Sequence, residues 1–341
     1  MDKRLEKINT WLNKDLSFQV TSLKPASQDA SFRRYFRLRG RSSQYLGINS
    51  FIIMDAPPEL ESITEFVAIS KILSANKIHS PFIYAADFEK GFILLEDLGK
   101  RTYLDELDNQ VDSLYRDAIQ ALIKIQMIDR ELNGEFSSDL TECSYKPAIY
   151  NNELIQQELD LFIDWYCIKH QQKQLSKLDL SIWQQLKEQL YNIFSEQPQV
   201  WVHRDFHSRN LMITEHNSPG VIDFQDMVWG PISYDLASIF KDCYIAWPRA
   251  QQLAWLEDYL LVNKNNNNLA NIDIEQLTYW YDLTGLQRHL KVLGIFCRLN
   301  YRDNKSHYLN DLPLVENYIH EVLSIYPELT DFKKIFDTVS Q

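Results

Sequence analysis

Short apolar runs dominate the first 98 residues of the chain. An amphipathic helix is expected over 2–14, where apolar residues recur at helical spacing. Strand-like runs follow at 18–24, 32–39, 50–54, 82–88 and 91–95, with one helical pattern at 61–73. This order of three strands, a helix and two strands predicts a small antiparallel sheet with one helix packed on it.

The pattern becomes mainly helical after the polar, glycine-containing break Glu96-Asp97-Leu98-Gly99. Helices are expected at 111–130, 148–170, 180–196, 231–243, 248–263, 273–302 and 310–325. Short strands are expected at 200–202, 211–214 and 220–223. The chain is therefore predicted to be an α+β protein with an N-terminal lobe, 1–98, and a larger, mainly helical C-terminal lobe, 99–341.

Composition and charge narrow the class of partner. The sequence of 341 residues carries a formal net charge of −12, which disfavours nucleic acid and anionic membranes as general partners. No apolar stretch approaches the roughly 18 residues of a transmembrane helix. The four cysteines are scattered without metal-ligand spacing, as is typical of reduced thiols. A cytoplasmic, monomeric protein is expected.

Two acidic motifs carry the strongest chemical signal. The first is His203-Arg204-Asp205-Phe206-His207-Ser208-Arg209-Asn210, and Asp223-Phe224-Gln225 follows it after a short interval. Transfer of a phosphoryl group from ATP needs a carboxylate that accepts the proton of the attacking hydroxyl, and ligands that hold Mg²⁺. The spacing predicts Asp205 as the catalytic base, with Asn210 and Asp223 as Mg²⁺ ligands. The alternatives are a turn-capping Asp at 205 and structural roles for the other two.

Several other residues in or near these motifs could have one of two roles. We expect His203 to shape the loop through backbone hydrogen bonds. Asp235 could cap a helix or hydrogen-bond the catalytic loop from behind, and we favour the second role. His207 and Arg209 could face the substrate, although Arg209 could equally pair with an acid in solvent.

The segment after the second motif is too short for a protein substrate. The next recognisable stretch is Gly230-Pro231-Ile232-Ser233-Tyr234-Asp235-Leu236. Its proline, Pro231, comes only about six residues after Gln225. A protein kinase needs a long activation segment at this place. A small-molecule acceptor is therefore predicted.

These motifs resemble those of the aminoglycoside phosphotransferase/choline kinase superfamily. The resemblance covers roughly residues 5–325. Three further stretches resemble bacterial kinases that phosphorylate N-acetylmuramate and N-acetylglucosamine at C1 in cell-wall recycling. They are 29–37 (DASFRRYFR), 54–58 (MDAPP) and 287–294 (QRHLKVLG). The resemblance implies a protein-kinase-like two-lobe fold, ATP and Mg²⁺ as cofactors, and an adenine-binding hinge that includes Glu96 and Leu98.

The sequence departs from the kinase pattern where phosphates bind. Gln28-Asp29-Ala30-Ser31 stands in place of a glycine-rich loop, and the third strand, 51–55, has no lysine. Strand alternation makes Arg34 the one charge on an apolar face, so Arg34, or failing that Arg33, is predicted to replace the lysine; solvated edge charges are the alternative. The resemblance implies Glu65 as the ion-pair partner, with Glu61 as competitor.

Candidate acceptor contacts are less sharply defined. Arg288, Lys291, Arg298 and Arg302 share one helix face. Arg288 and Arg298 could bind the lactyl carboxylate of N-acetylmuramate or form salt bridges. Trp229 could stack on a sugar ring.

The reading we favour is an ATP-dependent kinase of the anomeric hydroxyl of an amino sugar, active in peptidoglycan recycling. A kinase of aminoglycosides, choline or amino alcohols is the alternative within the class. A nucleotide-binding pseudokinase is the alternative outside it, supported by the absent lysine.

Overall fold

The structure is a computed structural model that describes residues 2–28, 32–130, 145–263 and 269–341. These residues form two compact units. Unit 1 comprises the described residues up to Arg101, Tyr145 and the returning segment Met212–Gln225. Unit 2 comprises the described residues of 102–132, 146–211 and 226–341. The chain thus enters unit 1 more than once, unlike the single division after residue 98 that the pattern suggested.

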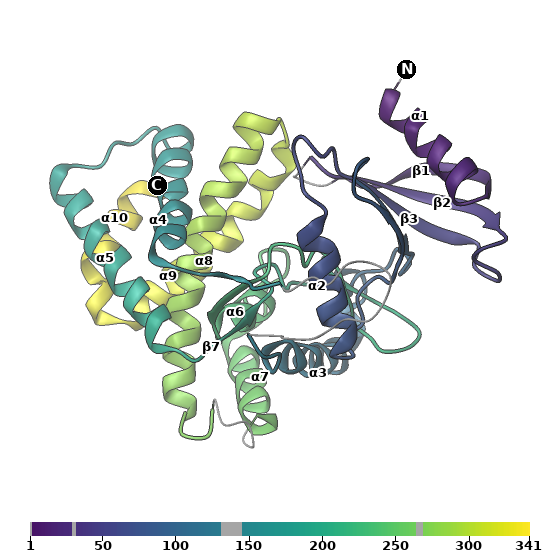
Figure 1. Cartoon of the computed structure of the whole chain (residues 1–341). Helices are drawn as coiled ribbons and strands as arrows, with labels where there is room; N and C mark the ends of the chain where they lie inside the picture. The colour runs from purple at the N-terminus through teal and green to yellow at the C-terminus, as the bar shows by residue number, and fades with distance from the viewer. Residues whose placement is uncertain (1, 29–31, 131–144, 264–268) are drawn as a thin grey trace. The chain divides into compact units, whose positions relative to one another are not determined.

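Unit 1 is built on a five-stranded antiparallel sheet in the order β1-β2-β3-β5-β4 (Figure 1). The strands are β1 (Phe18–Gln28), β2 (Arg34–Ser42), β3 (Ser50–Asp55), β4 (Ile83–Asp87) and β5 (Phe92–Glu96). The short strands β8 (Leu211–Met212) and β9 (Gly220–Val221) pair with each other. The predicted antiparallel sheet is therefore confirmed.

Helices pack on this sheet through apolar side chains. Helix α1 (Lys3–Thr10), continued by a π-helical segment, Trp11–Asp15, shares a buried cluster with Phe36, Leu38 and Phe51 of the sheet. Because side chains alternate along a strand, Met54, Ile93 and Leu95 point to the opposite face, and they are buried too. Helix α2 (Thr64–Ala75) buries Phe66, whose ring lies 4.7 Å from that of Phe224.

Unit 2 is mainly helical and is organised around one long helix. Its principal helices are α3 (Leu107–Gln126), α4 (Asn152–Leu161), α5 (Lys177–Glu196), α6 (Tyr234–Phe240), α7 (Arg249–Val262), α8 (Ile274–Asp303), α9 (Leu312–Ile325) and α10 (Thr330–Val339). Asp273 caps α8, accepting from Gln276 N at 2.8 Å, and Asn304 ends it in a left-handed conformation. Helices α4, α5, α6 and α9 pack along α8 (Figure 1).

A small sheet interrupts these helices. It has the order β6-β10-β7, from β6 (Ala148–Ile149), β10 (Val228–Pro231) and β7 (Gln199–Val202). The predicted helices 148–170 and 231–243 therefore begin later than expected, because their first residues are strands. Helix α4 also changes at Phe162 into a π-helical segment that ends at His170.

Burial along α8 differs from the amphipathic pattern that the sequence suggested. Every residue from Trp280 to Gly294 is buried, including the predicted basic face at Arg288 and Lys291. Charged side chains in this stretch must therefore be satisfied inside the protein. Among the helices that the structure describes, none is both long and apolar enough to cross a membrane.

Candidate active site

The predicted catalytic loop, 203–210, follows strand β7 in unit 2 and is held by its own backbone. Asn210 N donates to the His207 carbonyl at 2.9 Å, and Asn210 Nδ2 donates to the Asp205 carbonyl at 3.0 Å. This last bond fixes the orientation of the Asn210 amide. Its oxygen is consequently the atom that a cation would take.

Two buried carboxylates support the loop from behind. Asp235 at the start of α6 accepts from His203 N at 2.6 Å and from Arg204 N at 3.0 Å. Asp242, just after α6, accepts from Ser208 N at 2.8 Å and from Ser208 Oγ at 2.5 Å. Asp235 thus contacts the loop in the way we favoured from the sequence. Asp242 was not predicted, because a single acidic residue after a helix carries no signal of its own.

Asp205 is partly exposed and lies among positive charges of unit 2. Burial works to raise the pKa of the Asp205 carboxyl, but neighbouring cations hold that pKa below its ordinary value. The largest lowering comes from Lys291, and smaller ones come from His207, Arg288 and Arg204. The group therefore stays ionised at neutral pH, as a proton acceptor must.

A buried charge network lies next to the loop. Glu158 of α4, which is 5% exposed, accepts from Arg204 Nη2 at 2.5 Å and from Gln287 Nε2 at 3.0 Å. Lys291 Nζ lies 3.6 Å from Glu158 Oε1 and donates to the Tyr234 hydroxyl at 2.7 Å. The sequence placed Lys291 on a basic face but gave no sign of Glu158, which lies 46 residues before Arg204.

The other predicted acceptor residues have different surroundings. Arg288 is 2% exposed and donates a weak bond to Cys243 Sγ at 3.3 Å, so its burial argues against direct contact with a substrate. Arg298 is half-buried, and its Nε has no hydrogen-bond partner among the described residues. The Arg209 guanidinium lies 3.5 Å from the centroid of the Tyr244 ring.

Two further candidates also have close neighbours. The His207 ring lies 5.3 Å from the Tyr244 ring, and burial lowers the pKa of His207. The Trp229 ring lies 5.7 Å from the Arg130 guanidinium carbon, so an arginine already packs on this indole.

In unit 1, the second acidic motif begins at Asp223, two residues after the end of β9. Asp223 has a left-handed φ of 63°, and its Oδ1 accepts from Gln225 Nε2 at 2.8 Å. Val221 and Phe224 on either side are fully buried. The carboxylate thus lies between two buried apolar residues, although Ile222, which was expected in the same buried strand, lies outside β9 and is partly exposed.

The predicted hinge at the end of β5 is fixed by a network that the sequence did not reveal. Asp97 accepts from Arg37 Nε at 2.8 Å and Nη2 at 2.9 Å. Glu96 accepts from Phe82 N at 3.2 Å, and His79 lowers the pKa of Glu96. The Leu98 side chain packs so closely on Gly220 that a Cβ there would lie 2.7 Å from Leu98 Cδ1.

The arginines at the start of β2 differ from expectation. Strand β2 begins at Arg34 rather than residue 32, and Phe32 is 64% exposed. Arg34 Nη2 pairs with Asp55 at 2.5 Å and its guanidinium also binds Asp2, whereas Arg33 pairs with Glu61 at 2.7 Å. The assignment of Glu65 as the arginine's partner is therefore wrong, and Glu65 is exposed. Residues 29–31 of the predicted phosphate loop lie outside the described residues.

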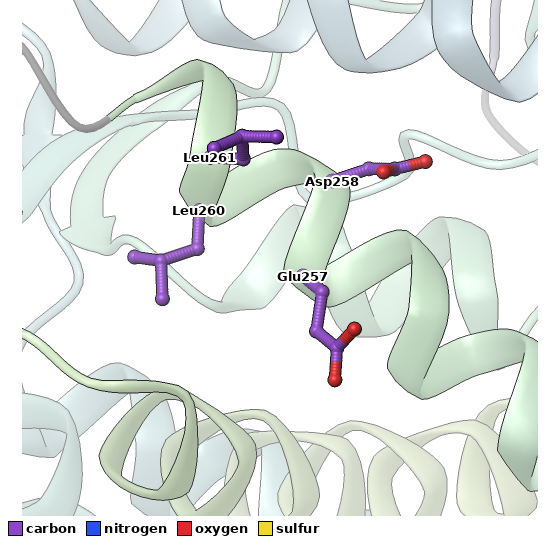
Figure 2. A pocket seen from close by; sticks show the side chains of 4 residues that line it. All are labelled: Glu257, Asp258, Leu260 and Leu261. Atoms are coloured by element: carbon purple, nitrogen blue, oxygen red, sulfur yellow. The ribbon is translucent and has the colours of Figure 1, made fainter.

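A surface hollow of about 320 Å³ on α7 is lined by Glu257, Asp258, Leu260 and Leu261 (Figure 2). None of the predicted site residues lines it. It therefore adds nothing to the catalytic loop described above.

Comparisons with known proteins identify the family of the chain. The profile of the phosphotransferase enzyme family matches residues 22–270. A Pseudomonas putida protein named N-acetylmuramate/N-acetylglucosamine kinase is 39% identical over 98% of this chain and 96% of its own length. A protein of the same name from Neisseria meningitidis serogroup B is 34% identical over 96% of this chain and 93% of its own length.

Solved structures show the same fold at low sequence identity. Choline kinase LicA from Streptococcus pneumoniae has a TM-score of 0.60 at 13% identity, covering 93% of this chain and 99% of its own. The ADP-bound aminoglycoside phosphotransferase APH(2'')-Ib has a TM-score of 0.59 at 16% identity, covering 92% and 97%. The kinase-like α+β fold is thereby confirmed. The chain belongs to the phosphotransferase enzyme family and is a phosphotransferase.

Proposed function

We propose that this phosphotransferase transfers the γ-phosphoryl group of ATP to the anomeric C1 hydroxyl of N-acetylmuramate and N-acetylglucosamine, in peptidoglycan recycling. The observation that carries the proposal is the ionised, partly exposed Asp205 on a loop held by Asp235 and Asp242. The names of relatives that share 34–39% identity over nearly the whole chain support the choice of acceptor.

The role of Asp205 is to orient the attacking hydroxyl and to accept its proton as the new O–P bond forms. An anomeric hydroxyl is more acidic than an ordinary alcohol, so a carboxylate with a low pKa is a sufficient base. Lys291 and Arg204 keep this carboxylate charged until it accepts the proton.

Mg²⁺ suits the donors that the two motifs offer. Asn210 presents an amide oxygen whose direction is fixed by the bond from its Nδ2, and Asp223 presents a carboxylate on a buried support. Hard cations of this kind take few protein oxygens and complete their shell with phosphate and water. The pairing of Asn210 with Asp223 is proposed from their spacing in the sequence. The ion would neutralise charge on the triphosphate.

For ATP, we propose that the hinge Glu96–Leu98 holds adenine and that Arg33 takes the place of the absent lysine. Arg34 is less suitable, because its guanidinium already neutralises the buried carboxylate of Asp55. Arg33, in contrast, forms an ion pair with an acid next to α2, as the lysine of kinases does with a helix glutamate.

The test is a product assay with Mg-ATP and four acceptors: N-acetylmuramate, N-acetylglucosamine, choline and kanamycin. We expect both sugars to be phosphorylated at C1, located by ³¹P and ¹³C NMR, and Asp205→Asn to abolish turnover. Phosphate on choline or kanamycin alone, or at another sugar oxygen, would contradict the proposal.

For the carboxylate of N-acetylmuramate we propose Arg298 as the contact. Among the described residues, the Nε atoms of Arg288 and Arg298 on α8 both lack a hydrogen-bond partner, but only Arg298 is partly exposed. Arg298→Ala should raise the KM for N-acetylmuramate about tenfold, as expected for one charge-assisted bond, and leave that for N-acetylglucosamine unchanged. Arg302→Ala, one turn further on the same face, is the matched control. Equal losses for both sugars would rule out carboxylate recognition.

A further inference from the structure

Arg204, directly before Asp205, has an unusual backbone conformation. Its φ is 75°, in the left-handed region that side chains other than glycine rarely adopt. Strain of this kind persists only where the surroundings hold the residue in place. The contacts of Arg204 must therefore stabilise this conformation.

Two sets of contacts hold it within unit 2. Its backbone N–H donates to Asp235 Oδ1 at 3.0 Å, as described above. Its side chain, 23% exposed, reaches Glu158 with Nη2 to Oε1 at 2.5 Å. The guanidinium carbon also lies 6.0 Å from the centroid of the Tyr150 ring.

Glu158 is itself rigidly placed. Its carboxylate accepts from the Tyr150 hydroxyl and from Gln287, and it faces Lys291. These partners come from the segment after β6 and from α8, so Glu158 ties the loop to both. A carboxylate that is 5% exposed can serve as a fixed anchor because every oxygen is hydrogen-bonded or ion-paired.

We infer that Arg204 is a positioning residue for the phosphoryl transfer: its ion pair with Glu158 holds the left-handed turn that directs the Asp205 carboxylate. Glycine would adopt this turn without strain but could not reach α4. The side chain of Arg204 therefore supplies a constraint that glycine lacks. The inference rests on the proposed role of Asp205.

The experiment compares Arg204→Ala, Arg204→Gly, Arg204→Lys and Glu158→Gln in the full-length chain. Arg204→Ala, Arg204→Gly and Glu158→Gln should lower kcat about 10- to 100-fold, the cost expected of a base displaced by a fraction of an ångström. The KM values for ATP and acceptor should stay within about threefold. Arg204→Lys should recover most of kcat, because an ammonium can still pair with Glu158.

The pairing itself is tested by the double variant Arg204→Ala/Glu158→Gln. If the two residues act through one another, kcat should fall no further than in the worse single variant. Asp160→Asn is the matched control: Asp160 lies on the same helix and forms an ion pair with Lys187 at 2.9 Å, away from the loop. Its kcat should not change.

Hydrogen exchange of the peptide that covers 203–210 gives a readout that needs no acceptor. Exchange should be faster in Glu158→Gln and Arg204→Gly than in the wild type. If no sugar is phosphorylated but loop exchange rises, the acceptor is wrong and the positioning role stands. The inference is overturned if folded Arg204→Gly and Glu158→Gln keep both wild-type kcat and wild-type loop exchange.

Discussion

At the scale of single residues, the charge of Asp205 depends on a lysine 86 positions away in the sequence. Lys291 lowers the pKa of Asp205 more than any other neighbour does. Since a nearby positive charge favours the ionised carboxylate, Asp205 remains ionised at every pH above its ordinary pKa of 3.8. If the wild-type rate falls as the pH drops from neutral, protonation of a group other than Asp205 must cause that fall.

Removing this charge should shift the pH dependence of the rate in a defined direction. In Lys291→Met the pKa of Asp205 rises, so that at a given acidic pH a larger fraction of the base is protonated and cannot accept the hydroxyl proton. The acidic limb of kcat should consequently move to higher pH, while kcat at pH 8 is less affected. The measurement is a pH–rate profile that extends from pH 9 to below pH 3.8, where the wild-type carboxylate titrates.

Lys187→Met serves as the control, because Lys187 is similarly buried but pairs with Asp160 on the outer side of α4. Its acidic limb should coincide with that of the wild type. If the profiles of Lys291→Met and the wild type superimpose, the lysine does not act on Asp205.

At the scale of elements, packing of α8 depends on one glycine. A Cβ at Gly294 would lie 2.4 Å from the backbone carbonyl of Leu161, which neither helix can move away cheaply. At Gly285, on the same helix, the nearest atom to such a Cβ is Lys241 Cδ at 3.5 Å, an ordinary contact. The same substitution should thus have opposite effects at the two positions.

Gly294→Ala should destabilise the protein by about 1–3 kcal/mol, the usual cost of overpacking. Gly285→Ala should be neutral or stabilise it by up to about 1 kcal/mol, because alanine favours the helix. Thermal and urea unfolding of both variants measure the difference. Equal free energies of unfolding would mean that α8 and α4 can separate without loss.

The sequence predicted the elements well where periodicity was long and poorly where it was short. The helix expected at 273–302 is observed as Ile274–Asp303, since thirty residues of one period leave little ambiguity. Strand β6 was predicted as helix, and β10 was missed except for Pro231, which was also predicted as helix. Segments of four residues or fewer carry no period, and only pairing of β6 with β10 and of β10 with β7 defines these strands. Helix α10 was not predicted at all.

The same contrast holds for the candidate site. Asp205, Asn210 and Asp223 are proposed as site residues from their spacing in the sequence alone. Glu158, Asp242 and the Arg37–Asp97 pair act through contacts between residues 34 to 60 positions apart. Such contacts depend on tertiary packing, so a single sequence contains no local signal for them.

At the scale of the whole molecule, the chain distributes its predicted functions over two compact units. The hinge and the arginines of β2 belong to unit 1, and Asp205 belongs to unit 2. Nucleotide affinity should therefore depend on unit 1 and be nearly independent of Asp205. Asp205→Asn should bind ATP with a Kd within about threefold of the wild-type value while turnover is lost, which also separates an enzyme from a binding module.

Within unit 1, substitution of Arg33 should impair the use of ATP, whereas substitution of Arg34 should lower stability. Arg33→Ala should raise the KM for ATP or lower kcat by more than about tenfold, since a charge-assisted bond to phosphate is lost. Arg34→Ala should instead lower the thermal unfolding temperature, because it removes one of the two arginines, Arg4 and Arg34, that neutralise the buried Asp55. Its KM for ATP should stay close to the wild-type value. The opposite result, with Arg34→Ala impaired in ATP use at unchanged stability, would restore Arg34 as the substitute for the kinase lysine.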